Sequence, residues 1–480
     1  MNITEPFRRL ARLMPTAPAI IRADGSTISY GLLDHAIDTI GAHAIRLGLK
    51  PGDIAALRIT GPDESIGLIL VLGLARIGVV TTDATLPSPP VALRFHAGSG
   101  TAPGAITVDA GWLPDGPADP GAPPPPIHRD SASIFRITES SGTTGMPKPV
   151  VVTHEQMTQR QLLHQLMEPS GPDTRRVVGV GFDCNIGMQY VLLTLWAGGT
   201  LVLSSPPRIA EALTRHGVTT IVTTPATLRA MLDGLPDDAG PFPSLRTVHT
   251  GGSLLPPALH RLTAERLTPE IHAIMGATEI SAIASGPMRD MVNKPDSVGT
   301  IWPGIDVEAL DEAGHPLPVG QTGVLRIRSP LLASGYLHAD DDAAERFQDG
   351  WFYASDIGTV WPDGTLTLSG RTSEAINAGG QKVHPHIIEQ ALLKLPTVLE
   401  AAAFGVPDSS GVVRIQAAIV ARAPIEDAVL ITFCQRALGP IAPVGILQMK
   451  ALPRNANGKI LRERLADTAM RLMHEAATGS

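Results

Sequence analysis

Cysteine is scarce in this sequence, which has only Cys184 and Cys434 among its 480 residues. Two thiols so far apart exclude a disulfide framework and a metal site built from thiolates. Long apolar runs are also lacking, because the longest, Ile66–Val80, contains glycine and is interrupted by Arg76. It is too short and too charged to span a bilayer. The N-terminus lacks the apolar stretch of a signal peptide, so we expect a cytoplasmic protein.

Dense runs of basic residues are absent as well. The chain has 38 basic and 46 acidic residues, a formal charge of −8, and only 18% of its residues are charged. A net negative chain of this kind is a poor ligand for nucleic acids or anionic membranes. At about 100–200 residues per domain, its length predicts two to four domains. These features indicate a soluble enzyme that binds neither nucleic acid nor membrane.

Short apolar runs alternate with amphipathic stretches through the first part of the chain. Ile54–Ile59 and Val177–Val180 have the composition of buried strands, whereas Tyr30–Gly48 and Ser65–Ile77 have helical periodicity. This alternation is typical of α/β proteins with a mostly parallel sheet. The sequence therefore predicts doubly wound sheets in a large N-terminal domain.

A further helix is expected over Gln156–Met167, with Thr153-His154 at its start. We expect His154 to cap this helix or to fill a core position, the usual fate of a lone histidine, rather than to act in catalysis. Cys184 and Cys434 are expected to be packing residues, because no histidine adjacent in sequence would activate either thiol.

The second part of the chain is richer in short strands and turns. Strands at Val307–Leu310 and Gly323–Arg328 and a turn at Trp361–Thr365 predict a small β-barrel-like subdomain. After Arg371 about a hundred residues remain, a usual domain size, and a helix is expected over Val383–Leu395. We therefore place an N-terminal domain at residues 1–371 and a small α+β C-terminal domain at residues 372–480.

The segment Ser140–Lys148, which reads SSGTTGMPK, carries the densest chemical signal. Its glycines let backbone N–H groups approach an anion closely, and its hydroxyls and Lys148 supply further donors and positive charge. It is not a Walker A loop, because Pro149 follows the lysine and no helix begins there. The segment predicts a nucleotide phosphate site, against the alternative of a hydroxyl-rich surface turn.

Residues Ser140–Val150, followed by Thr153-His154, resemble the signature of the adenylate-forming superfamily of AMP-binding enzymes. This superfamily includes acyl-CoA synthetases, the adenylation domains of peptide synthetases and luciferases. The further segments that resemble its motifs, in the family order, are Gly251-Gly252-Ser253, Met275–Glu279, Gly350–Asp356, Gly370-Arg371, and Asn457–Ile460 with Arg462. The resemblance extends from about residue 25 to residue 467 and is specific, because so many motifs match in order.

The resemblance implies that the protein activates a carboxylic acid with ATP, releases pyrophosphate, and transfers the acyl group from the acyl-adenylate to a thiol. A carboxylate is a weak nucleophile toward an anionic phosphorus, so charge neutralisation and positioning must do most of the catalysis. The residues that the resemblance assigns to the nucleotide are Ser140, Ser141, Gly142, Thr143, Thr144, Gly145, Gly252, Ser253, Met275, Gly276, Ala277, Asp356 and Arg371.

Individual roles around the phosphates also follow from the resemblance. Thr143, Thr144 and Lys148 would hold the β- and γ-phosphates. Thr278 would contact the α-phosphate. Glu279 would bind Mg²⁺, which prefers oxygen ligands.

The remaining implied roles concern the ribose and the C-terminal domain. Asp356 would accept hydrogen bonds from the ribose hydroxyls, with Arg371 beside it. Lys459 would swing into the site and bridge the carboxylate and α-phosphate oxygens, although a lone lysine in a turn is usually a solvated surface residue. The mobile C-terminal domain would then rotate about Ser373 so that a thiol reaches the acyl-adenylate.

The sequence departs from the family pattern at four places. Pro149 replaces the usual glycine after the loop lysine, and Met275 replaces the aromatic residue that commonly stacks on adenine. Ala354-Ser355 stands in place of a Thr-Gly or Ser-Gly pair, and Ser373 stands where Asp or Lys is common. These departures support a different class of function, a non-catalytic homologue that binds nucleotide. Because the implied catalytic residues are all present, an active enzyme is the favoured interpretation.

The resemblance places the acid in a pocket lined by Phe182, Asp183, Ile186, Gly187, Thr250 and Gly251, with Ala277 and Ser281 near the reacting carboxylate. The pair Phe182-Asp183 is similar to that of peptide-synthetase adenylation domains, in which the aspartate pairs with a substrate ammonium. The spacing from this pair to Ala197-Gly198-Gly199 is closer to that of acyl- and aryl-CoA ligases. Asp183 would therefore face an amino, hydroxyl or aryl substituent, or water, and the side chain of the acid stays open.

CoA is the expected acceptor thiol, because Asn377–Val383 resembles the tails of CoA ligases. The 3′-phosphate of CoA needs surface cations, for which Arg175-Arg176 and Lys382 are candidates. The alternative is a stand-alone adenylation enzyme that loads an amino or aryl acid onto the phosphopantetheine of a carrier protein.

Overall fold

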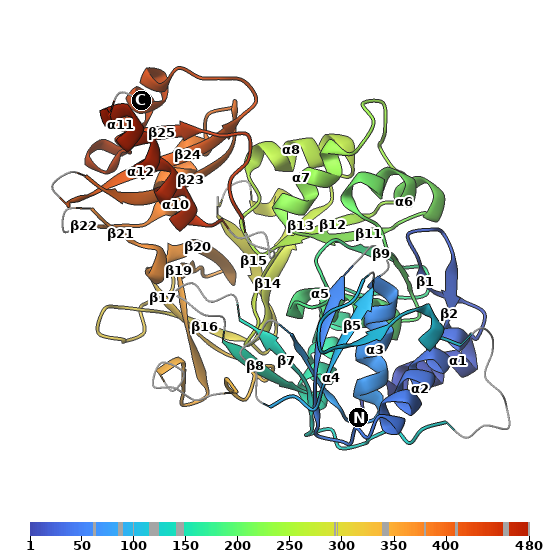
Figure 1. Ribbon diagram of the computed structural model, residues 1–480. Coiled ribbons are helices and arrows are strands. Elements are labelled where there is room, and N and C mark those ends of the chain that lie inside the picture. Colours follow the sequence, from blue (N-terminus) through green and yellow to red (C-terminus); the bar gives the residue numbers. More distant parts are fainter. Residues whose placement is uncertain are drawn as a thin grey trace.

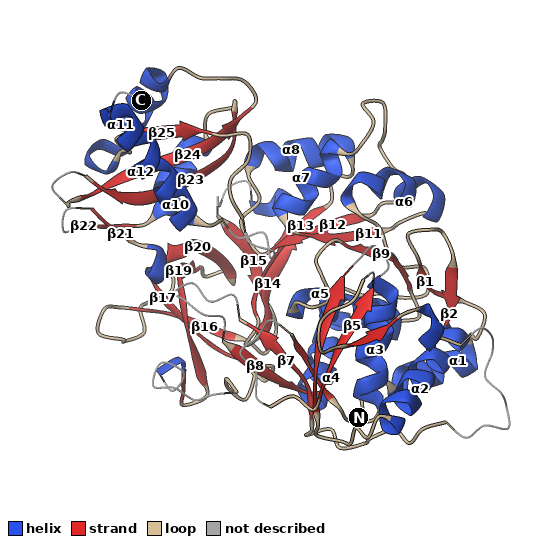
Figure 2. Ribbon diagram, viewed as in Figure 1, coloured by secondary structure: helices blue, strands red, loops and turns tan. Residues whose placement is uncertain are grey.

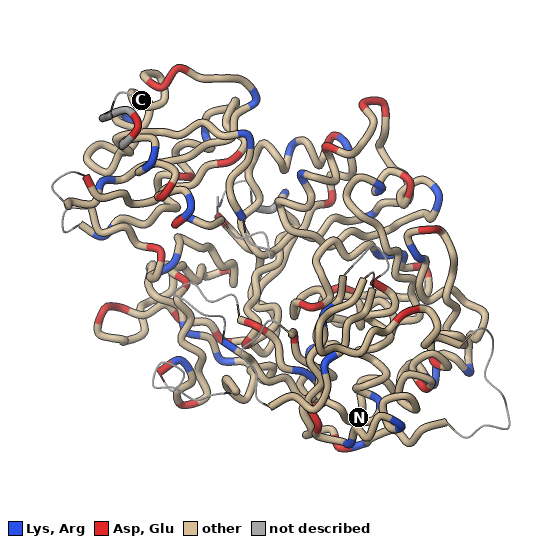
Figure 3. The backbone as a smooth tube through the Cα atoms, in the orientation of Figure 1, with Lys and Arg blue, Asp and Glu red and all other residues tan. Residues whose placement is uncertain are grey.

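The computed structural model describes the chain apart from residues 61–63, 85–89, 99, 115–123, 141–147, 292–293, 295, 338–344, 379–380, 409–410, 455–459 and 479–480. Two large sheets and, near the C-terminus, a smaller one form the frame of the molecule (Figure 1). Helices cover these sheets, as expected for an α/β protein (Figure 2). Basic and acidic residues are interspersed over the fold (Figure 3). Among the described helices, none has both the length and the apolar character that a membrane crossing requires.

The first sheet has six strands in the order β6-β5-β3-β4-β7-β8. Its pairs are parallel except for β7 and β8, which run antiparallel on either side of the predicted phosphate loop. Helix α3 packs on this sheet, α2 packs on α3, and α1 packs on α2. The elements are β3 (Ile54–Thr60), β4 (Val80–Asp83), β5 (Leu93–Gly98), β6 (Ile106–Val108), β7 (Ile134–Glu139), β8 (Pro149–Thr153), α1 (Glu5–Leu13), α2 (Tyr30–Arg46) and α3 (Glu64–Arg76).

The second sheet begins with a parallel half in the order β13-β12-β11-β9-β10-β1, with β2 antiparallel at its edge. Helices α4 and α5 lie on one face of it, and α6, α7 and α8 cover the other face (Figure 2). The strands are β1 (Pro18–Ile21), β2 (Thr27–Ser29), β9 (Arg175–Val178), β10 (Thr200–Val202), β11 (Thr220–Thr223), β12 (Thr247–Gly251) and β13 (Ile271–Ala277). The helices are α4 (His154–Met167), α5 (Asn185–Trp196), α6 (Ile209–His216), α7 (Pro225–Asp233) and α8 (Pro257–Arg266).

The antiparallel half of the second sheet is the small β subdomain that the turn signals predict. It is not a separate sheet, because the hairpin β13–β14 joins it to the parallel half by continuous hydrogen bonding. The predicted turn at Trp361–Thr365 connects β19 to β20. The strands are β14 (Ser281–Pro287), β15 (Ser297–Ile301), β16 (Asp306–Leu310), β17 (Thr322–Arg328), β18 (Phe347–Gln348), β19 (Trp351–Val360) and β20 (Thr365–Arg371).

The C-terminal part has a three-stranded sheet, a short hairpin and its own apolar core (Figure 1). A contact of His386 Nε2 with Asp296 Oδ2, at 3.2 Å, links it to the second sheet. Its elements are β21 (Ile376–Ala378), β22 (Gln381–Val383), α10 (Pro385–Leu393), β23 (Val398–Pro407), β24 (Val413–Ala421), α11 (Asp427–Leu438), β25 (Gly445–Gln448) and α12 (Arg462–Thr478). Short 3₁₀ turns lie at Ala110–Trp112, Pro206–Arg208, Met288–Met291, Thr372–Glu374 and Gly439–Ile441. A domain boundary between residues 371 and 372 stays a prediction.

The helix predicted over Gln156–Met167 begins two residues earlier, at His154. The reason is a capping box, in which the Thr153 hydroxyl accepts from the Gln156 N–H while the Gln156 side chain accepts from the Thr153 N–H. His154 is fully buried, and its Nδ1 accepts a hydrogen bond from the Ile3 N–H. Burial lowers the pKa of His154 to about 4, so the ring is neutral. The structural role expected for this histidine is confirmed.

The helix predicted over Val383–Leu395 is shorter and spans Pro385–Leu393. Val383 belongs instead to strand β22, and Pro385 at the first helical position starts the helix, since its fixed φ suits that position.

A buried charge cluster joins the first three helices. The guanidinium of Arg76, the last residue of α3, is fully buried and bonds to Asp34 Oδ1 and Asp38 Oδ1 at 2.6 Å each. Arg8 on α1 bonds to the same two carboxylates. Arg76 also donates to the Thr4 carbonyl oxygen, which fixes the N-terminal segment. The cluster explains how the apolar run Ile66–Val80 accommodates a cation.

We expect Arg76→Met to destabilise the fold by about 3–5 kcal/mol, because it leaves two carboxylates in a largely buried site with one cation fewer. The urea midpoint of unfolding measures this loss. Arg9→Met, which removes an exposed arginine from the same helix as Arg8, is the matched control. Equal midpoints for the two variants would show that the cluster does not stabilise the fold.

Candidate active site

The predicted phosphate loop is closed at its base by two hydrogen bonds between its end residues. The Ser140 N–H donates to the Lys148 carbonyl oxygen at 2.8 Å, and the Lys148 N–H donates to Ser140 Oγ at 3.2 Å. The antiparallel pair β7–β8 therefore holds the two ends together. The predicted phosphate ligands between them, Ser141, Gly142, Thr143, Thr144 and Gly145, lie outside the described residues.

Tyr336 connects Lys148 to Glu279. The Lys148 Nζ atom lies 5.2 Å from the centre of the Tyr336 ring, in a cation–π contact. The Tyr336 hydroxyl donates to Glu279 Oε1 at 2.8 Å, and Phe347 packs edge-on against the ring. The predicted cation and the predicted carboxylate are thus in one chain of contacts. Sequence reasoning missed Tyr336, because it lies 57 residues from Glu279 in a segment without a distinctive spacing.

Thr278 and Glu279 lie in the turn of the β13–β14 hairpin. Ala277 and Ser281, which pair across the two strands, close this turn. The Thr278 hydroxyl donates to the Glu139 carbonyl oxygen at 3.1 Å, which brings the turn next to the end of β7. The Glu279 side chain is buried, and its carbonyl oxygen accepts from the Ala333 N–H at 2.6 Å. The turn therefore lies beside the start of the phosphate loop.

Glu279 suits Mg²⁺ chemically. Its carboxylate is a hard oxygen ligand with one oxygen oriented by Tyr336. Within the described residues, no group of three or more His, Cys, Asp and Glu side chains could hold a metal ion. A single carboxylate fits Mg²⁺ bound mainly to nucleotide phosphates and water, which is how this ion usually binds.

The predicted ribose ligand Asp356 lies opposite Arg371 on the paired strands β19 and β20. Arg371 Nε donates to Asp356 Oδ1 at 2.8 Å, with the carboxylate mostly buried. This bond fixes the orientation of the carboxylate, as a ribose ligand requires.

The other predicted nucleotide contacts lie at the ends of β12 and β13. Gly252 and Ser253 are exposed directly after β12, with Gly252 at a positive φ of 84°. Met275 is buried in the core behind the hairpin. At Gly276 a Cβ atom would lie 2.4 Å from the Ser281 carbonyl oxygen, so only glycine allows the hairpin to close.

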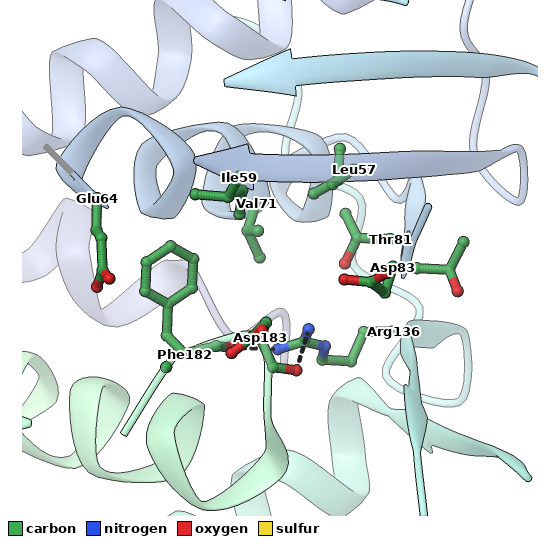
Figure 4. Close-up of a pocket in the computed structure, with 11 residues that line it drawn as sticks. Leu57, Ile59, Glu64, Val71, Thr81, Asp83, Arg136, Phe182 and Asp183 are labelled. Atoms are coloured by element: carbon green, nitrogen blue, oxygen red, sulfur yellow. Dashed lines mark hydrogen bonds between the residues drawn. The ribbon is translucent and has the colours of Figure 1, made fainter. Parts of the chain in front are cut away.

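A cavity of about 130 Å³ lies between the first sheet and the loop after β9 (Figure 4). Apolar side chains from β3 and α3 form one wall, the Phe182 ring closes one end, and Thr81 and Asp83 lie at the other. The lining residues are Leu57, Ile59, Glu64, Val71, Thr81, Thr82, Asp83, Arg136, Gly181, Phe182 and Asp183. Of the predicted acid-pocket residues, Phe182 and Asp183 are thus placed against the first sheet.

Arg136 on β7 fixes the loop that carries these two residues. Its guanidinium donates to the carbonyl oxygens of Phe182 and Asp183, at 2.9 Å each. Burial lowers the pKa of Arg136, while Asp183 and neighbouring groups oppose this effect. Burial also raises the pKa of Glu139, with Asp83 and Asp183 acting in the same direction. The cavity therefore combines one buried cation with an acidic rim.

Three other predicted acid-pocket residues, Ile186, Gly187 and Gly251, lie at the start of α5 and at the end of β12. A Cβ atom at Gly187 would lie 2.1 Å from the Gly181 carbonyl oxygen, so the glycine allows the loop to pack on α5. A Cβ atom at Gly251 would lie 3.6 Å from Ile186 Cδ1, which places these two residues together. Ser281 is buried, and its hydroxyl donates to Gln189 Oε1 on α5.

Thr250 is not placed with Gly251 and Ile186. Neighbouring residues of a strand point to opposite faces, and Val248 packs with the α6–α8 helices. Thr250, two residues further on, shares that face. Its hydroxyl is buried and has no hydrogen-bond partner among the described residues.

Two further expectations concern cations. The prediction that Arg176 is a surface cation for CoA is wrong, because its guanidinium is buried and donates to the hydroxyls of Thr194 and Ser170. Arg175 donates to the His216 carbonyl oxygen. Lys382 is exposed on β22.

Lys459 lies outside the described residues, but both flanks of its segment are anchored. Arg454 is paired with Glu400 at 2.6 Å, and Arg462 is paired with Glu389 at 2.6 Å. Ser373, the predicted hinge, lies in the 3₁₀ turn after β20, and its buried hydroxyl has no partner among the described residues.

Both cysteines are packing residues, as expected. The Cys184 thiol donates to the Gly181 carbonyl oxygen at 2.9 Å and its sulfur caps α5. Burial raises the pKa of Cys184 to about 11, and it also raises the pKa of the buried Cys434. Neither thiol suits a nucleophile.

Three known proteins are similar to this chain, two in sequence and one in fold, over most of their length. The chain is 29% identical to a sulfoacetate–CoA ligase of Cupriavidus necator, over 97% of this chain and 99% of the ligase. It is 26% identical to a salicyl-AMP ligase / salicyl-S-ArCP synthetase of Mycobacterium tuberculosis, over 95% and 88% of the two chains. An o-succinylbenzoate CoA synthetase of Bacillus subtilis, solved with its acyl-adenylate intermediate, has the same fold with a TM-score of 0.82 at 22% identity, over 96% and 97% of the two chains.

Models of protein families match the two parts of the chain separately. The model described as AMP-binding enzyme matches residues 97–337, and that of the AMP-binding enzyme C-terminal domain matches residues 387–459. These matches show that the chain belongs to the AMP-binding enzyme family.

Proposed function

We propose that this protein is an AMP-forming acid–thiol ligase, which activates a small carboxylic acid with ATP and transfers the acyl group to CoA. The single observation that carries this proposal is the contact chain from Lys148 through Tyr336 to Glu279, at the base of the phosphate loop. This contact chain supports the proposal because it brings a cation close to a buried carboxylate beside the loop that we expect to bind the phosphates of ATP. A non-catalytic nucleotide-binding homologue would not need both.

In the first step an oxygen of the acid attacks the α-phosphorus of ATP, and the bond from that phosphorus to the pyrophosphate oxygen breaks. Lys148 neutralises the departing phosphates and Thr278 contacts the α-phosphate. Glu279 would hold Mg²⁺, which would supply further neutralisation of phosphate charge. Asp356, oriented by Arg371, holds the ribose and so aligns the phosphorus with the acid.

In the second step the acceptor sulfur attacks the carbonyl carbon of the acyl-adenylate, and AMP leaves with the electrons of the carbon–oxygen bond. Between the two steps the C-terminal part turns about Ser373. Lys459 then leaves the site, and the acceptor thiol takes its place. Lys382, exposed on β22, is then a candidate contact for the CoA phosphate.

The size and lining of the cavity beside Phe182 favour a small acid with a polar substituent as the substrate. Its volume of about 130 Å³ suits a group of a few heavy atoms. Apolar side chains line one wall, while Thr81, Asp83 and Asp183 offer polar partners to an amino or hydroxyl group. A carrier-protein thiol is the second candidate acceptor, because one similar enzyme is named as a salicyl-S-ArCP synthetase.

Pyrophosphate release with ATP and Mg²⁺ tests the proposal. The acids are amino, hydroxy, aryl, sulfonated and fatty acids, each with and without CoA. We expect release with one class, and multiple turnovers only when CoA is present. Single turnover with CoA present would instead indicate a carrier protein. No release with any acid, despite measurable ATP binding, would favour the non-catalytic homologue.

Lys459→Ala should abolish pyrophosphate release, because the bridge between the acid and the α-phosphate is lost. Thioester formation from supplied acyl-adenylate should stay within a few-fold of wild type, since Lys459 has left the site by then. Lys450→Ala, at an exposed lysine of the same part of the chain, is the control. Equal loss in both half-reactions would contradict this role.

Asp183→Ala should change the preferred acid, because it removes a carboxylate from the cavity. The measurement is the ratio of kcat/KM values across the same acids. Asp173→Ala, at an exposed aspartate shortly before β9, should leave that ratio unchanged. An unaltered acid profile for Asp183→Ala would remove this residue from the pocket.

A further inference from the structure

Three polar residues outside the family motifs lie on one face of α4 and directly after its end. Arg160, His164 and Glu168 are spaced four residues apart, which places them on the same side of the helix. Arg160 and His164 are buried, and the Glu168 side chain is 8% exposed. Buried charged and polar groups are retained only where they have partners, so the partners of this face indicate its role.

Arg160 holds the backbone of the β13–β14 turn. Its Nη2 donates to the Glu279 carbonyl oxygen at 3.2 Å and to the Leu331 carbonyl oxygen at 3.0 Å. Its Nη1 donates to Asn185 Oδ1 at 3.3 Å. Glu279 is thus fixed at two points, by Arg160 through its backbone and by Tyr336 through its carboxylate.

His164 holds the same turn two residues further on. His164 Nε2 lies 3.2 Å from Ser281 Oγ, and the Ser281 hydroxyl donates to Gln189 Oε1 at 2.9 Å. Because that hydroxyl uses its hydrogen on Gln189, it accepts the hydrogen of His164 Nε2. Burial lowers the pKa of His164 to about 4, so the ring is neutral, with its hydrogen on Nε2. The rings of Tyr190 and Trp302 pack against His164 and fix its plane.

Ser281 has an unfavourable backbone conformation, with φ at 91°. A non-glycine residue keeps such a conformation only where its surroundings impose it, and such residues concentrate at functional sites. Here the imposed conformation closes the turn against Gly276, which lies close to the Ser281 carbonyl oxygen. The two hydrogen bonds of the Ser281 hydroxyl, together with the pairing of Ser281 with Ala277, hold this conformation.

We propose that Arg160, His164 and Ser281 are positioning residues for the adenylation step, which fix the Thr278–Glu279 turn and so aim the Glu279 carboxylate. The inference rests on the proposed function, in which Glu279 binds Mg²⁺ at the phosphates. Arg160 and His164 have no predicted contact with the substrate. Ser281, which the sequence predicts near the reacting carboxylate, is buried, and its hydroxyl bonds to His164 and Gln189. The Glu168 side chain completes the network behind them, where it accepts from the Tyr190 hydroxyl at 2.6 Å and faces His249.

Ser281→Gly is the decisive variant, because glycine adopts the positive φ without strain while it removes both hydrogen bonds. We expect normal folding, faster hydrogen exchange in the peptide that spans residues 274–284, and a fall in kcat for pyrophosphate release of about 10- to 100-fold. The KM for ATP should change less, since most nucleotide contacts remain. Ser281→Ala loses the same bonds but keeps the strain, so it should melt at a lower temperature than Ser281→Gly.

A pair of variants at His164 separates positioning from packing. His164→Leu fills the space without a donor and should reproduce the effect of Ser281→Gly on exchange and kcat. His164→Gln places an amide donor at similar reach and should restore both. His96→Leu is the matched control, because His96 is likewise buried and bonded to a hydroxyl, that of Thr60, but on the first sheet.

Hydrogen exchange does not depend on catalysis, so it tests the positioning even if the wild-type protein releases no pyrophosphate. Unchanged exchange of the 274–284 peptide in both Ser281→Gly and His164→Leu would overturn the inference. An equal fall in kcat for His96→Leu would overturn it as well, since the effect would then be general destabilisation.

Discussion

The hairpin between β13 and β14 is the constraint on which the site depends. At this point the second sheet changes from parallel to antiparallel, so the chain must reverse within a few residues at the carboxyl end of β13. In open α/β sheets the carboxyl ends of the strands are where ligands bind. The reversal places Thr278 and Glu279 there, and Gly276 allows the two strands to approach closely enough. The continuous sheet also connects β19 and β20, which carry the proposed ribose ligands Asp356 and Arg371, to the β13–β14 hairpin.

Buried arginines hold the loops of the site in place. Arg136 bonds to the carbonyl oxygens of Phe182 and Asp183, and Arg160 bonds to that of Glu279. Arg176 fixes α5 through the Thr194 hydroxyl. Carbonyl oxygens of loops have no strand partner, and a guanidinium with several donors satisfies them inside the protein. A chain with few charged residues thus uses some of its cations for internal structure rather than for its surface.

The sequence predicted the local elements well, because strand and helix periods and caps are local properties. Helix α2, strand β3 and the β19–β20 turn lie close to their predicted positions. The motif residues Glu279, Asp356 and Arg371 were found through a family resemblance, and their pairing with Tyr336 and with one another is a property of the fold. Tyr336, Arg136 and the α4 face were missed, since their partners are far away in the chain.

The predicted acid pocket shows the same limit of prediction from sequence. Phe182 and Ile186 are four residues apart, and spacing alone groups them on one surface. In the fold Phe182 faces the first sheet, whereas Ile186 faces the second, because Gly187 lets the intervening loop pack tightly on the start of α5. Which face a side chain takes in such a loop depends on packing that no short stretch of sequence encodes.

The state of the Cys184 thiol has a chemical consequence for the proposed reaction. An acyl-adenylate is a mixed anhydride that acylates thiolates readily, and Cys184 is adjacent in sequence to Asp183, which lines the cavity. Burial raises the pKa of Cys184 to about 11, and its hydrogen is donated to the Gly181 carbonyl oxygen, so the sulfur is held as the thiol at neutral pH. The protein can therefore hold a reactive acyl donor beside its own sulfur without acylating itself. The acyl group is kept for the incoming thiol, and reagents that alkylate thiolates should spare this cysteine.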